Sequence, residues 1–169
     1  MESQISKMPQ KLNLTNLRLI MELQEEIKSS KFENIFQQAL VNVYFTYHWS
    51  NQNVKELLVP YDITHQQFNV LRILRGQYPK PCTNNVIKSR IIDKMSDISR
   101  IVERLVQKGY VHKNINEEDK RALDILISMK GLKLLKKMDQ EIDFTSFIHP
   151  NLSEEEAVQL NFLLDKFRG

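Results

Sequence analysis

The sequence predicts a mainly α-helical fold with one small β-hairpin, for three reasons. The 169 residues include only 4 glycines and 5 prolines, too few for a turn-rich β-sandwich or barrel. Through most of the chain, apolar residues recur at three- and four-residue intervals, as on the buried face of a helix. Between residues 110 and 127 they alternate with polar residues instead, which indicates two short strands.

The composition is that of one folded domain with added segments. Hydrophobic residues make up 41% of the chain and charged residues 27%, which excludes a disordered tail or a fibrous repeat. The single cysteine, Cys82, cannot close a disulfide within the chain, and the first residues lack the pattern of a signal peptide. The longest uncharged stretch, residues 34–54, is too polar to span a bilayer. We therefore expect a cytoplasmic protein without a membrane segment.

The N-terminal part is expected to hold three helices. Residues 1–30 predict a short amphipathic helical extension, and residues 31–58 predict a long helix with a wide apolar stripe. Thr64 and Gln67 have the spacing of a capping box, in which each residue's side chain bonds the other's backbone. A third helix should therefore begin there and end near residue 77, before a proline.

Two shorter helices follow before the hairpin. Thr83 is placed to cap the first of them. The second is expected to begin within two residues of Lys94, with Asp93 or Ser96 as its cap. It should end at Gly109, because glycine readily takes the left-handed backbone that closes helices.

The C-terminal part begins with the hairpin, which spans residues 110–127 and has a polar tip at 116–121. Ser128 is placed to cap the next helix, and a second capping box, Ser153 with Glu156, opens the last one.

A short helix, a tight turn, a second helix and a β-ribbon form the order of a winged helix-turn-helix domain. In that arrangement the second helix fits the major groove of DNA, while the ribbon tip follows the backbone or enters the minor groove. Similar helix and hairpin units also serve as plain packing modules. The order of elements alone leaves both interpretations open.

The distribution of charge favours DNA binding. Between residues 83 and 121 there are nine basic and six acidic residues, so this segment carries the whole net charge of +3. The rest of the chain is neutral. The excess positive charge therefore lies on the segment that would meet phosphate groups.

Three motifs follow one another at close spacing: SRIVERLVQKGYV at 99–111, DKR at 119–121 and ISMKG at 127–131. Together they resemble the multiple-antibiotic-resistance regulator (MarR) family of bacterial transcription factors. In that family a recognition helix ending in Lys-Gly leads into a wing with Asp-x-Arg, and a Leu-Thr-x-x-Gly-like segment opens the next helix. The resemblance covers about residues 32–167 and leaves the first thirty without a counterpart.

The resemblance implies a role for the wing tip. In such proteins the wing arginine, here Arg121, reaches into the minor groove, and the aspartate, here Asp119, holds its guanidinium in place. A narrow minor groove has a deep negative potential, which suits a planar cation. The alternatives are a solvated loop charge for Arg121 and a turn-forming role for Asp119.

The polar face of the recognition helix would supply the major-groove contacts. We expect Arg100 to read a guanine edge, Ser96 and Ser99 to make phosphate or mixed contacts, Asp97 to accept from cytosine and Arg104 to touch phosphate. Simple solvation is the alternative for each residue. The complete set of expected DNA-binding residues is Thr83, Lys94, Ser96, Asp97, Ser99, Arg100, Arg104, Asp119, Lys120 and Arg121.

The resemblance also implies a homodimer with intertwined terminal helices and a palindromic operator. We expect a helical extension at 1–30, dimerisation helices at 31–60 and 129–169, and a winged helix-turn-helix domain at 61–128. The apolar surface near the C-terminus exceeds what one small domain buries, which is typical of a subunit interface. It includes Phe144, Phe147, Ile148, Phe162 and Phe167.

Many regulators of this family respond to a small aromatic or lipophilic molecule. The aromatic cluster of Tyr44, Tyr47, His48 and Trp49 is a candidate wall for such a ligand, although a stripe of this kind also occurs in ordinary cores. Cys82 is expected to be structural rather than an oxidant sensor.

No motif indicates an enzyme, a cofactor or a metal. The four histidines lack metal-ligand spacing, and no nucleophile elbow or glycine-rich phosphate loop occurs. We therefore expect a dimeric, sequence-specific DNA-binding regulator of transcription, acting as a repressor. A helical dimer that senses a small molecule or acts as a protein adaptor without binding DNA is the alternative.

Overall fold

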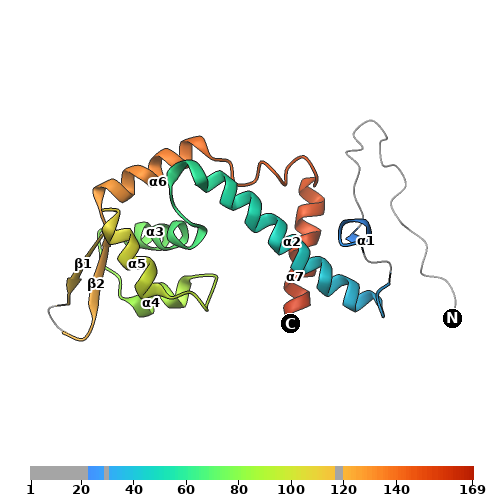
Figure 1. The fold of residues 1–169 in the computed structure, drawn as a ribbon, viewed down its shortest axis with the longest axis horizontal. Coiled ribbons are helices and arrows are strands. Elements are labelled where there is room, and N and C mark those ends of the chain that lie inside the picture. Colours follow the sequence, from blue (N-terminus) through green and yellow to red (C-terminus); the bar gives the residue numbers. More distant parts are fainter. Residues whose placement is uncertain (1–22, 29–30, 117–119) are drawn as a thin grey trace. The chain divides into compact units, whose positions relative to one another are not determined.

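The computed structural model describes residues 23–28, 31–116 and 120–169 (Figure 1). Contacts divide the chain into two compact units, Met1–His48 and Trp49–Gly169. The described part of the first unit holds α1 (Leu23–Glu26) and the beginning of α2 (Ile35–Leu58), a helix that continues into the second unit. Most of the helix predicted within residues 1–30 lies outside the described residues.

The second unit contains the predicted succession of helices and hairpin, which confirms the fold class. A short 3-10 helix, Val59–Tyr61, follows α2. The remaining elements are α3 (His65–Gln77), α4 (Asn84–Arg90), α5 (Ile98–Gln107), β1 (Val111–Ile115), β2 (Leu123–Ile127), α6 (Met129–Glu141) and α7 (Glu154–Arg168).

Local signals set most of the helix ends as predicted. Both capping boxes are present, at the starts of α3 and α7. The hydroxyl groups of Thr83 and Ser128 accept backbone N–H groups in the first turns of α4 and α6. Gly109, which follows the end of α5, has a φ of 73°, the left-handed conformation expected there.

The start of α5 differs from the prediction. The helix begins at Ile98, later than the expected position near Lys94, and its cap is Asp97 rather than Asp93 or Ser96. The Asp97 carboxylate accepts a backbone N–H of the first turn at 3.1 Å. Asp93 instead accepts the Ser96 hydroxyl at 2.8 Å, so that the residues between them form a turn and not helix.

The core lies where α3, α5, β2 and α6 meet. α3 packs against α4, α5, α6 and β2, and α5 also packs against β1. The side chains that are almost completely buried include Leu71, Leu74, Ile87, Val102, Leu105, Ile125, Leu135 and Met138. Burial of each large apolar side chain contributes about 1.5–3 kcal/mol, so this centre holds the helix-turn-helix and the hairpin in one body.

The C-terminal aromatic residues divide into two groups. Phe144 stacks on Phe68 with ring centroids 4.9 Å apart, and Phe147 meets Trp49 edge-on at 5.4 Å. Both side chains are therefore partly covered within the chain and partly exposed, and their place in a subunit interface stays a prediction. Phe162 and Phe167 on α7 are 65% and 51% exposed, as expected of an interface.

Among the residues that the structure describes, none of the helices has both the length and the apolar character required to cross a bilayer.

Candidate nucleic-acid interface

The recognition helix α5 presents one face to the core and the other to solvent. Ile98, Val102 and Leu105 are buried. Arg100 and Arg104 are exposed on the outer face. The buried residues fix which way the arginines point, because positions three and four apart share one side of a helix.

The charge of this outer face is positive after its ion pairs are counted. Glu103 also lies on the face, but its carboxylate pairs with the Lys113 ammonium of β1 at 2.5 Å. Within the described part of the chain, no ion pair joins Arg100 or Arg104 to a carboxylate. Two guanidinium groups are therefore available for an anionic partner, and guanidinium binds phosphate and guanine edges through paired donors.

The other predicted residues near the start of α5 are engaged within the chain. Asp97 caps the helix, and Ser96 donates to Asp93. The Ser99 hydroxyl accepts the Asn84 side-chain amide at 3.4 Å. A hydroxyl can also donate, so Ser99 retains a donor for a phosphate oxygen.

Lys94 acts on a neighbouring helix. Its ammonium donates to the backbone oxygens of Lys88 at 3.3 Å and Ser89 at 2.7 Å, near the end of α4. Helix-terminal carbonyls lack partners and attract cations, so Lys94 serves as a cap for α4. Thr83 caps the other end of that helix.

Asn84 belongs to this site and was not identified from the sequence. It is the first residue of α4, and its amide reaches Ser99 on α5. Its Oδ1 atom is buried and has no hydrogen-bond partner among the described residues. The sequence signal was weak, because an amide directly after a cap is common in helices that bind nothing.

The wing is an antiparallel hairpin anchored on both sides. β1 and β2 pair in register from Val111 with Ile127 to Ile115 with Leu123. On the other edge of β2, the backbones of Cys82 and Ile125 exchange two hydrogen bonds of 2.8 Å. The hairpin is therefore attached to the segment that leads directly into α4.

Near the wing tip, Lys120 and Arg121 are exposed. Asp119 lies outside the described residues, and so does the predicted contact between Asp119 and Arg121.

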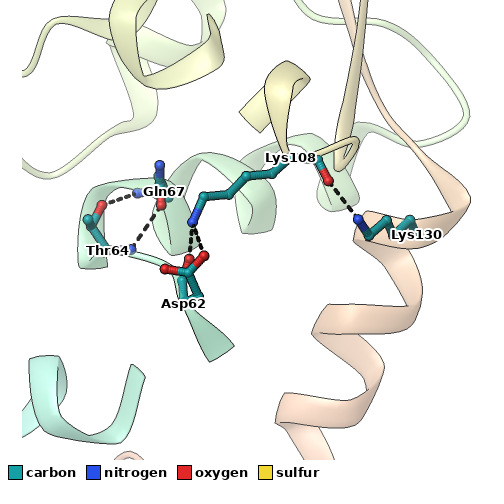
Figure 2. A network of polar contacts seen from close by, with 5 residues as sticks. All are labelled: Asp62, Thr64, Gln67, Lys108 and Lys130. Carbon is teal, nitrogen blue, oxygen red and sulfur yellow. Dashed lines mark hydrogen bonds and ion pairs between the residues drawn. The ribbon is translucent and has the colours of Figure 1, made fainter. Parts of the chain in front are cut away.

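The C-terminal end of α5 is held by a network of polar contacts (Figure 2). The Lys108 ammonium lies 2.8 Å from the Asp62 carboxylate and also donates to the Asp62 backbone oxygen. The Lys108 backbone oxygen accepts the Lys130 ammonium of α6 at 2.8 Å. Asp62 lies two residues before Thr64, which forms the capping box of α3 with Gln67.

A groove of about 590 Å³ lies beside this network. Its wall is formed by the end of α2, the beginning of α3 and the second half of α5, and includes Asn51, Lys55, Asp62, His65, Arg104, Gln107 and Lys108. Burial lowers the pKa of His65 below its usual value of 6.5. A small molecule in this groove would touch the recognition helix.

The aromatic cluster predicted to bind a ligand does not line this groove. Tyr44 and Tyr47 are each 61% exposed, and the Tyr47 ring meets His48 edge-on with centroids 5.3 Å apart. Trp49 is partly covered by Phe147.

Cys82 is buried, and burial raises the pKa of its thiol, although the nearby Arg90 guanidinium partly opposes this. A protonated, buried thiol reacts slowly with oxidants. In the described part of the chain, no group of three or more histidine, cysteine, aspartate or glutamate residues is arranged to hold a metal ion.

Comparison with known proteins agrees with this geometry. A sequence model of the MarR family matches residues 63–123. The multiple antibiotic resistance protein MarR of Escherichia coli (strain K12) is 29% identical over 126 residues, which cover 70% of this chain and 85% of that protein.

Solved structures show the same fold. A mutant of the Escherichia coli MarR protein, complexed with operator DNA, superposes with a TM-score of 0.72 at 26% identity, covering 82% of this chain and 99% of that one. An organohalide-sensing transcriptional regulator in its 2,4-dichlorophenol-bound form has a TM-score of 0.70 at 19% identity, covering 82% of this chain and 85% of that one. The family model over residues 63–123, the MarR relatives and the MarR structures of the same fold together support the assignment of this chain to the MarR family.

Proposed function

We propose that this protein is a homodimeric repressor that binds a palindromic operator through α5 and the wing. The observation that carries the proposal is the outer face of α5, where Arg100 and Arg104 are exposed without a carboxylate partner among the described residues. The neighbouring wing adds two more exposed cations, Lys120 and Arg121. The MarR protein solved with operator DNA has this arrangement of elements and supports the same use here.

Some of these residues would position the protein on the DNA backbone, and others would read the base sequence. Arg100 lies in the first turns of α5 and is suited to a guanine edge. Arg104, one turn later, is suited to phosphate. Ser99 and Asn84 lie where two helices begin and would fix the backbone of one strand. Arg121 would enter the minor groove from the wing.

A second copy of the chain would cover the exposed apolar side chains at both ends of the described chain. On α2 these are Ile35, Phe36, Leu40, Tyr44 and Tyr47, and on α7 they are Val158, Leu160, Phe162, Leu163 and Phe167. Apolar surface of this extent marks an interface in a soluble protein. Sedimentation should give a dimer for the wild type, and Phe162→Glu should shift it toward monomer. An unchanged dimer in this variant would place the interface elsewhere.

Release by a small ligand is the second part of the proposal. The groove beside α5 has walls of mixed polarity, and a molecule there would contact Arg104 and Lys108 of the recognition helix. The regulator of the same fold that was solved with 2,4-dichlorophenol indicates the chemical class to test first. The aromatic cluster of Tyr44, Tyr47, His48 and Trp49 would contribute where a second subunit covers it.

The decisive experiment is a selection of duplexes from random DNA, followed by affinity measurements over a salt series. We expect a palindrome with half-sites about one helical turn apart, and an affinity that falls steeply with salt. If the wild type shows no salt-sensitive binding to any duplex, the alternative of a helical sensor or adaptor without DNA binding gains support.

A further inference from the structure

We infer that Lys108 and Lys130 are positioning residues for DNA binding, which hold the C-terminal end of the recognition helix without touching DNA. The inference rests on the proposed function, because its readout is operator affinity. Lys108 lies within the basic segment of residues 83–121, and Lys130 lies beyond its end.

The Lys108 side chain is partly covered. It is 29% exposed, and its ammonium contacts the carboxylate and the backbone oxygen of Asp62, whose own side chain is 94% exposed (Figure 2). Asp62 lies in the turn between the 3-10 helix and α3, and has a φ of 51°. The contact therefore joins the last turn of α5 to the segment between α2 and α3.

Lys130, on α6, contacts the same end of α5. Its ammonium donates to the Lys108 backbone oxygen at 2.8 Å and lies 4.9 Å from the centre of the Tyr110 ring. The final carbonyls of a helix lack partners and carry partial negative charge, so a cation there is favourable. The Tyr110 ring adds a cation–π contact.

The neighbouring backbone makes this attachment tight. The Ser128 hydroxyl donates to the Gly109 backbone oxygen at 2.8 Å, and the Ser128 N–H donates to the Tyr110 oxygen at 2.9 Å. The helix end is thus attached to two separate segments. A helix that reads base edges must be held to within about 0.5 Å, and these contacts supply that restraint at the end remote from the bases.

The test compares Lys108→Met and Lys130→Met with the wild type on a selected duplex. Lys108→Met loses two charged hydrogen bonds and Lys130→Met loses one, and each variant should bind about three- to tenfold more weakly. The slope of log affinity against log salt should stay unchanged, because neither lysine neutralises a phosphate. Loss of a direct phosphate contact would lower that slope by about 1. Lys130→Arg, which keeps a cation, should restore most of the affinity.

Controls separate positioning from folding and from the proposed function itself. Lys133→Met, at an exposed site on α6, should bind like the wild type. Asp62→Asn keeps the backbone oxygen that accepts Lys108 and should weaken binding less than Lys108→Met. Hydrogen exchange of the Gly109 amide, measured in the protein without DNA, should be faster in Lys130→Met. This measurement reports on the helix end itself, independently of any loss of affinity caused by lower stability.

The outcomes are distinct. A wild type that binds no duplex overturns the proposed function and leaves the exchange measurement to decide whether the restraint exists. A wild type that binds, together with unchanged affinity in both lysine variants or a reduced salt slope, overturns the inference alone.

Discussion

A Cβ atom added at Gly131 would stand 2.4 Å from the backbone oxygen of Tyr110. It would also lie 2.8 Å from the Cγ1 atom of Ile127. Real Cβ atoms do not approach other atoms this closely, so α6 meets the start of the wing at a distance that only glycine permits. The fifth residue of the ISMKG motif is therefore explained by packing and not by contact with DNA.

Gly131→Ala should lower the free energy of unfolding by about 1–3 kcal/mol, the usual cost of forcing atoms into a filled space. Gly76→Ala is the matched control, because a Cβ there has no neighbour within 4 Å. That control should gain up to about 1 kcal/mol from better helix propensity. Urea unfolding measures both. Equal effects of the two substitutions would contradict the close approach.

Arg121→Ala should weaken operator binding and lower the salt slope by about 1, because it removes a cation from the wing. Lys166→Ala, on α7, is the comparison and should change neither quantity. Operator affinities of both variants, measured over a salt series, give both quantities. If Arg121 and Lys166 behave alike, the wing has no part in recognition.

Asp97→Ala should cost about 0.5–2 kcal/mol of stability through loss of the α5 cap. Asp97→Ser keeps a capping oxygen and should leave stability nearly unchanged. The same pair tests the base contact predicted from the sequence. If the carboxylate only caps the helix, the Ser variant will bind the operator at least as tightly as the wild type, since a negative charge near phosphate is gone. Weaker and less selective binding by Asp97→Ser would instead support the predicted contact between Asp97 and cytosine.

Stability should fall as the pH is lowered through 6.5, because burial holds the pKa of His65 below that value in the folded state. Between the lower folded pKa and 6.5, the unfolded chain binds more protons, so protonation favours unfolding. Urea unfolding at about pH 7.5 and pH 5.5 measures the loss. His65→Asn should reduce the difference, whereas His112→Asn on the exposed face of β1 should not. Hydrogen bonds from Thr145 lower the pKa of Asp143 below 3.8. Protonation of that carboxylate should therefore reduce stability only at a more acidic pH than the His65 effect.

The sequence was most informative where a structural signal is local. Thr64 with Gln67, Ser153 with Glu156, and Gly109 each mark a helix end through contacts within a few residues, and all three ends were predicted. The hairpin followed from its change of period. These features depend on the chain nearby and not on distant packing.

Features that depend on distant segments were missed or misplaced. Asp93, Ser96 and Asp97 are all good caps, and the choice among them follows from how the turn folds before α5. The stacking of Phe144 on Phe68 could not be predicted, because the two residues lie far apart in the sequence.

The candidate site shows the same limit. Its outer arginines were identifiable from helix periodicity, since Arg100 and Arg104 are one turn apart on a strongly amphipathic helix. The intramolecular role of Lys94 was not, because a lysine before a recognition helix looks the same whether it contacts DNA or caps α4. The groove was also unpredictable, because separate segments form its wall.

The paired hydrogen bonds between Cys82 and Ile125 link the two parts of the molecule that would grip a duplex. Thr83 follows Cys82 and caps α4, while Ile125 lies on the strand that leads away from the wing tip. The base of the wing is thus tied to the start of α4. If both bind DNA as proposed, an operator with differently spaced grooves would have to bend or twist to fit the protein, and DNA stiffness would contribute to the selection of the site.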